Sequence, residues 1–140
     1  MKRITFFISL VAVILLGLSC TGKGNKKEVS TAISAQGINV YYFHFTRRCA
    51  TCMAVEENGR KAFEALYQNE IKAGEYSFSS LNLDEESTKE IADKLGVGGQ
   101  SMLVVRGDKK LDITAAVWMS AHDIEKMKEE IRSGVEKVMY

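Results

Sequence analysis

The sequence INVYYFHFTRRCATC, residues 38–52, joins a strand-like segment to two closely spaced cysteines. Its first part, Ile38–Phe45, is rich in β-branched and aromatic residues, which is typical of a strand buried on both faces. A helix is then expected over residues 50–73, because apolar residues recur there at intervals of three and four. Cys49 and Cys52 therefore lie between a buried strand and the start of a helix.

The rest of the chain predicts alternating strands and helices. Ser120 is expected to cap the final helix at its N-terminus. The order β-α-β-α-β-β-α needs a parallel strand pair first and an antiparallel hairpin later. We therefore expect an α/β fold, a mixed four-stranded sheet with helices on both faces. Its remaining elements are expected to be a strand over Tyr76–Leu83, a helix over Asp84–Leu95, strands over Ser101–Arg106 and Leu111–Trp118, and a helix ending near Met139.

The N-terminus has the pattern of a secretory signal. A short basic start precedes an apolar run over residues 4–18. This run is shorter than the roughly 20 residues that a bilayer-spanning helix needs, and it has the length typical of a signal peptide. A small residue before Cys20 resembles a bacterial lipoprotein signal, which implies that residues 1–19 are removed and Cys20 is lipidated. An uncleaved anchor or simple secretion are the alternatives.

Residues 20–36 are polar and small, and they are expected to form a flexible tether before a domain over residues 37–140. This organisation predicts a lipid-anchored protein of the cell envelope that faces the periplasm, where cysteine pairs can be oxidised.

The composition excludes several classes of protein. The chain has 140 residues, 26% of them charged, and a net charge of +1. Such a balance does not supply the basic face that nucleic-acid binding needs. The length fits one folded domain, which we expect to be a monomer. We expect no cofactor, because the Gly-x-Gly-x-x-Gly fingerprint of flavin and nicotinamide binding is missing.

Two cysteines separated by two residues, after a strand and at a helix start, resemble the thioredoxin superfamily over about residues 38–140. The segment Tyr42–Cys52 is similar to a small bacterial family of thioredoxin-like lipoproteins. Its members are the ArsF-type, nitrophenyl-compound nitroreductase subunits, often associated with arsenic-resistance operons. This resemblance implies dithiol–disulfide chemistry at Cys49 and Cys52, and a protein thiol or disulfide as the partner.

The sequence departs from the thioredoxin pattern at two positions. An acidic residue six positions before the first cysteine is replaced by Phe43, which implies slower reduction of substrates through the second cysteine. A cis-proline facing the cysteines is replaced by Ser101. Because a cis bond before any other residue costs about 2.5–4 kcal/mol, we expect a trans peptide and a differently shaped loop there.

Cys49 is the candidate nucleophile. The N-terminus of a helix favours a thiolate, and the positive charges of Arg47 and Arg48 should lower the pKa of Cys49 further. Cys52, one turn further along, should be shielded and should resolve a mixed disulfide. The alternatives are a structural disulfide, although so small a loop stabilises a fold little, or two inert core cysteines.

Three further residues are candidates for contact with the substrate or the thiolate. His44 is either a third ligand or proton shuttle near Cys49, or a core histidine with one bonded ring nitrogen. Gln100 and Ser101 belong to the loop expected to face the cysteines.

The sequence leaves three functions open. The first is thiol–disulfide exchange. The second is capture of arsenite or a soft metal by the thiolates of Cys49 and Cys52, which the missing proline favours. The third is a non-catalytic interaction subunit of a redox or arsenic-resistance system.

Overall fold

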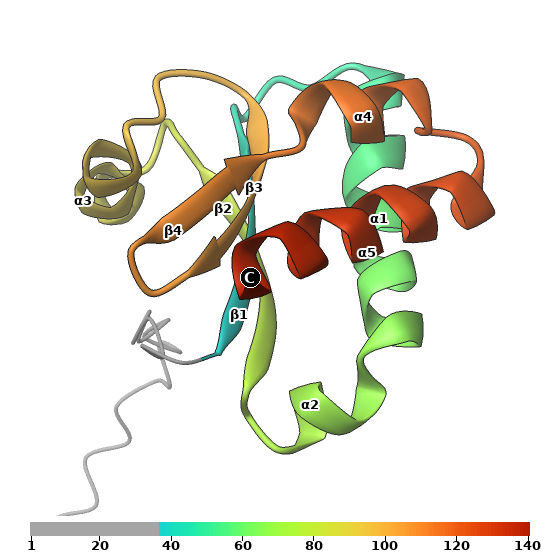
Figure 1. Ribbon diagram of the computed structural model, residues 1–140. Coiled ribbons are helices and arrows are strands. Elements are labelled where there is room, and N and C mark those ends of the chain that lie inside the picture. The colour runs from blue at the N-terminus through green and yellow to red at the C-terminus, as the bar shows by residue number, and fades with distance from the viewer. Residues whose placement is uncertain (1–36) are drawn as a thin grey trace, which may run out of the picture. The chain divides into compact units, whose positions relative to one another are not determined.

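A computed structural model describes residues 37–140 as an α/β domain (Figure 1). Its elements follow in the order β1 (Ile38–His44), α1 (Ala50–Leu66), α2 (Gln68–Lys72), β2 (Tyr76–Asn82), α3 (Glu86–Leu95), β3 (Ser101–Arg106), β4 (Lys109–Asp112), α4 (Thr114–Met119) and α5 (Ile124–Met139).

The four strands form one mixed sheet in the order β2-β1-β3-β4. β1 pairs in parallel with β2 and antiparallel with β3, and β3 pairs antiparallel with β4. The central position of β1 explains its composition, because six of its seven residues are buried. The expected α/β class and the mixed four-stranded sheet are confirmed.

Helices cover both faces of the sheet (Figure 1). Side chains alternate along β1, so Val40 and Tyr42 join one core cluster while Tyr41 and Phe43 join the other. The first cluster lies against α1 and α5, and the second lies against α3. The α1–α5 side holds the larger core, and it continues to the end of β1 where the cysteines follow.

The strand expected over Leu111–Trp118 is wrong. β4 ends at Asp112, and a helix, α4, begins at Thr114. Polar contacts end the strand: the Asp112 carboxylate accepts a hydrogen bond from the Thr114 N–H at 2.8 Å. The Thr114 hydroxyl in turn accepts one from the Met102 N–H at 2.9 Å. The Thr114 side chain thus replaces a backbone acceptor for the Met102 N–H, and the chain turns away into a helix.

Two helix boundaries also differ from expectation. The helix expected over residues 50–73 breaks at Tyr67, whose φ of −130° and ψ of 36° are not helical, and α2 follows. The final helix is capped by Asp123, whose carboxylate accepts from the Lys126 N–H at 3.1 Å. Ser120 instead terminates α4. None of the helices within residues 37–140 has the length and apolar character that crossing a membrane requires.

Candidate functional site

Cys49 and Cys52 form a disulfide at the N-terminus of α1, with their Cα atoms 5.1 Å apart. Cys49 is the N-cap residue, and its Sγ accepts a hydrogen bond from the Cys52 N–H at 3.2 Å. Cys49 is exposed, whereas only 7% of Cys52 is accessible. One sulfur can therefore be reached from solvent while the other faces the interior.

The turn between β1 and α1 is held by hydrogen bonds to the last residue of β2 and to the segment that follows it. The Thr46 N–H donates to the Asp84 carboxylate at 2.8 Å, and the Asn82 amide donates to the Thr46 hydroxyl at 3.0 Å. The bond from the Thr46 N–H is the main reason that the pKa of Asp84 is lowered. These contacts fix the backbone that leads into Cys49.

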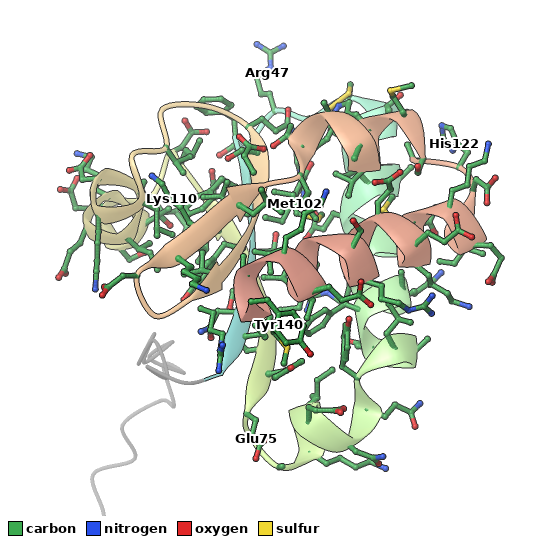
Figure 2. All side chains as sticks on the ribbon, in the orientation of Figure 1. Arg47, Glu75, Met102, Lys110, His122 and Tyr140 are labelled. Atoms are coloured by element: carbon green, nitrogen blue, oxygen red, sulfur yellow. A yellow bond between two sulfur atoms is a disulfide. The ribbon has the colours of Figure 1, made fainter. Side chains whose placement is uncertain are left out.

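Arg47 and Arg48 have different surroundings although they are neighbours in this turn. Arg47 is exposed, and its side chain projects away from the domain (Figure 2). Arg48 is half-buried and forms an ion pair with Glu56 of α1. The two expected charges beside Cys49 therefore differ in how freely they can act on it.

Sequence reasoning missed Glu56. Burial would raise the pKa of Glu56, but the nearby Ser80 hydroxyl and the positive charge of Arg48 outweigh burial and lower it. A carboxylate is thus held ionised close to the cysteine turn. Its place four residues after Cys52, on the same side of a helix, is the one sequence feature that could have indicated it.

Gln100 reaches the cysteine turn through Tyr42, a second residue that sequence reasoning missed. The Gln100 amide donates to the Tyr42 hydroxyl at 2.7 Å, and that hydroxyl donates to the Cys52 carbonyl at 2.8 Å. The ring of Trp118 stacks on Tyr42 with 5.9 Å between centroids. The loop before β3 is therefore connected to the backbone of the buried cysteine.

Ser101 is buried at the start of β3, where it pairs with Phe43. Its hydroxyl donates to the Gly99 carbonyl at 3.3 Å. Residues 37–140 contain no cis peptide bond, so the peptide before Ser101 is trans.

His44 lies at the end of β1, partly exposed. Its Nδ1 is 2.9 Å from the Phe45 carbonyl oxygen, and its ring centroid is 5.8 Å from that of Tyr42. The described part of the chain contains no group of three or more His, Cys, Asp or Glu side chains placed to hold a metal ion. The structure therefore does not combine His44 with the two cysteines as a ligand set.

Cys20, the predicted signal peptide and the predicted tether lie outside the described residues.

Comparison with known proteins assigns neither a family nor a function. No family model and no curated protein matches this sequence. Among solved structures, one described as "Structure of a malarial protein" is similar, with 13% sequence identity and a TM-score of 0.48. That match covers 75% of this chain and 100% of the other chain.

Proposed function

We propose that this protein is a thioredoxin-like thiol–disulfide exchange protein in which Cys49 attacks and Cys52 resolves. The observation that carries the proposal is the disulfide between an exposed N-cap cysteine and a buried cysteine one turn later. The strand order, with a parallel β1–β2 pair and antiparallel β3 and β4, supports a thioredoxin-like fold.

The exchange uses only the two sulfurs of the chain and two sulfurs of a partner. The Cys49 thiolate attacks one sulfur of a partner disulfide, and the other partner sulfur leaves as a thiolate. The Cys52 thiolate then attacks Cys49 Sγ, so the Cys49–Cys52 bond forms and the second partner thiolate leaves. Two electrons pass from chain to partner, and the same steps in reverse reduce the chain.

The site favours Cys49 over Cys52 as the thiolate that attacks the partner disulfide. Exposure gives a partner access to Cys49, whereas Cys52, in the first turn of α1, is only 7% accessible. The unpaired N–H groups at the start of α1 and the positive charge of Arg47 both stabilise a thiolate at Cys49. The Cys52 N–H already donates to Cys49 Sγ, which shows one such contact in place.

Single-cysteine variants test this proposal. In the reduced chain, Cys52→Ser leaves Cys49 as the reacting thiol of the described residues, and Cys49→Ser leaves Cys52. We expect Cys49 to be alkylated by iodoacetamide at least about tenfold faster than Cys52 at pH 7, with a pKa below the roughly 8.5 of a free thiol. Both variants also carry Cys20→Ser, so that the third cysteine does not contribute.

Equilibration with glutathione separates exchange from a purely structural disulfide. We expect the wild-type disulfide to be reduced and reformed reversibly as the ratio of reduced to oxidised glutathione is changed. Equal alkylation rates at the two cysteines, together with a disulfide that does not equilibrate, would contradict the proposal and favour a structural bond.

Two further sequence predictions have tests of their own: metalloid capture, which is an alternative to the exchange function, and lipidation. Capture of arsenite by the reduced cysteine pair is tested by calorimetric titration of the reduced chain, and no binding heat would remove that function.

Lipidation of Cys20, and with it the envelope location, is tested by mass spectrometry of the native N-terminus. An intact Met1 would contradict it.

A further inference from the structure

The two arginines that precede Cys49 differ in what they contact. Arg47 is exposed and projects into solvent (Figure 2), whereas Arg48 is 26% exposed and is paired with Glu56, itself 21% exposed. A charge held in a half-buried ion pair is less available to a third group than a free charge is. Arg48 is therefore less available than Arg47 to stabilise a thiolate at Cys49.

Glu56 occupies an unusual position on α1. Residues 52, 56, 59 and 63 are spaced by three and four, so they follow one side of the helix. Cys52, Gly59 and Phe63 on this side are buried, and Glu56 is the charged residue among them. Helix α1 and the sheet approach each other closely here. A Cβ added at Gly59 would lie only 2.9 Å from the Cε atom of Met102 in β3. The carboxylate is thus held between helix and sheet, one turn beyond the buried sulfur.

Groups from three segments surround this carboxylate. Arg48 pairs with it from the turn before α1, and the Ser80 hydroxyl of β2 lowers its pKa. From β1, His44 also lowers the pKa of Glu56, and Glu56 in turn raises the pKa of Tyr42, for which burial is the larger cause. Tyr42 is the residue whose hydroxyl bonds to the Cys52 carbonyl. The ion pair and the cysteine turn therefore belong to one connected cluster.

We propose that Glu56 is a positioning residue that tunes the reduction potential of the Cys49–Cys52 pair. By holding Arg48 in an ion pair, and by placing a negative charge one turn from Cys52, Glu56 limits the stabilisation of the thiolate form. This inference rests on the proposed exchange function and deepens it.

The direction of the effect follows from the redox equilibrium. Oxidised glutathione takes two electrons from the reduced chain, the Cys49–Cys52 bond forms, and two molecules of glutathione are released. Anything that stabilises a cysteine thiolate stabilises the reduced chain and makes the disulfide a stronger oxidant. Glu56 acts against that stabilisation, so it makes the reduced chain a stronger reductant.

Charge-neutral variants at the two positions test the proposal. The measured quantity is the equilibrium constant for oxidation of the full chain, carrying Cys20→Ser, by glutathione disulfide at pH 7. We expect Glu56→Gln to lower this constant by about twofold to fivefold, because Arg48 is then free to stabilise the thiolate. We expect Arg48→Gln to raise it, because the Glu56 charge is left uncompensated.

Three further variants show whether charge causes the shifts in the equilibrium constant. The double variant Arg48→Gln/Glu56→Gln should return close to the wild-type constant, and Arg48→Lys should preserve it. Glu57→Gln is the matched control, because Glu57 is the neighbouring carboxylate, is 66% exposed and pairs with Lys61 instead. It should leave the constant unchanged.

The direction in which each single variant shifts the equilibrium constant for oxidation distinguishes tuning of the reduction potential from a structural role. If the ion pair only held the turn in place, both single variants would lose the same contact and shift the constant in the same direction. That result, or no shift in Glu56→Gln, would overturn the inference.

The pH at half-maximal alkylation of Cys49 gives a second readout, and we expect Glu56→Gln to lower it. A wild-type disulfide that does not equilibrate with glutathione would instead contradict the proposed function itself. Circular dichroism confirms that each variant compared is folded.

Discussion

Two adjacent tyrosines in β1 show how strongly the position of a single side chain determines its role. Tyr42 lies on the α1 side, where its hydroxyl donates to the Cys52 carbonyl and accepts from Gln100. Tyr41 points to the α3 side, where its buried hydroxyl has no hydrogen-bond partner among the described residues. Burial raises the pKa of both.

Phenylalanine at each position should therefore have different effects. Tyr42→Phe should lower the free energy of unfolding of the oxidised chain by about 1–3 kcal/mol, because it removes two hydrogen bonds and leaves the Gln100 amide without its acceptor. Tyr41→Phe is the matched control. It should be neutral or slightly stabilising, because the Tyr41 hydroxyl loses its hydration on burial and gains no hydrogen bond in return. Urea denaturation measures both, and equal losses would contradict this assignment.

At this scale the sequence indicated candidate residues through their spacing along the chain. Cys49, Cys52, Arg47 and Arg48 are close together in the sequence, and the structure joins the two cysteines in a disulfide. The contacts of Glu56 and Tyr42 depend on how α1 packs against the sheet, which local spacing does not describe. Gln100 was a candidate from its place in the loop before β3, but local spacing could not indicate its contact with Tyr42 of β1.

At the scale of elements, the segment after β4 shows why a strand was expected and a helix formed. Apolar and β-branched residues over Leu111–Val117 are compatible with either structure, and periodicity over so short a run cannot decide between them. Tertiary bonds decide, because the Met102 N–H bonds to the Thr114 hydroxyl and the Met102 carbonyl accepts from the Ile113 N–H at 3.0 Å. β1, with its continuous apolar run, left no such ambiguity.

The Thr114 hydroxyl should therefore contribute measurably to stability. Thr114→Val keeps the shape of the side chain but leaves the Met102 N–H without its acceptor, so we expect a loss of about 1–3 kcal/mol. Thr114→Ser keeps the acceptor and should cost clearly less. Urea denaturation of the oxidised chain compares the two, and a loss in Thr114→Ser as large as that in Thr114→Val would contradict the assignment of the stabilisation to the hydroxyl.

At the scale of the whole domain, the aromatic residues gather where α1, α2 and β2 meet. The Phe63 ring lies 5.2 Å from Tyr67 and 6.4 Å from Tyr76, and Tyr67 and Tyr76 are 5.2 Å apart. Burial, and then the neighbouring Tyr76, raise the pKa of Tyr67 to about 12. The pKa of Tyr76 is raised too, with burial as the main cause.

This cluster predicts a loss of stability in alkali. Between pH 10 and about 12 the unfolded chain loses the Tyr67 proton while the folded chain keeps it, so the unfolded state binds fewer protons. The free energy of unfolding should therefore fall as the pH rises through this range, and Tyr67→Phe should make the fall less steep. Urea denaturation from pH 8 to 11 measures the slope.

Tyr140→Phe is the control for this experiment, because Tyr140 is 96% exposed. It should leave the slope as in the wild type. An unchanged slope in Tyr67→Phe would mean that the cluster does not contribute to alkaline unfolding.

The direction of β1 separates the first described residues from the cysteine turn. The described chain enters β1 at Ile38, and the cysteine turn follows the other end of this seven-residue strand (Figure 1). Seven residues of extended backbone span about 20 Å. If the preceding residues tether the domain to a membrane, as the sequence predicts, the tether joins the domain at the end of the central strand that is remote from the disulfide. The point where the tether joins would then leave the disulfide end accessible to a partner protein of the proposed exchange.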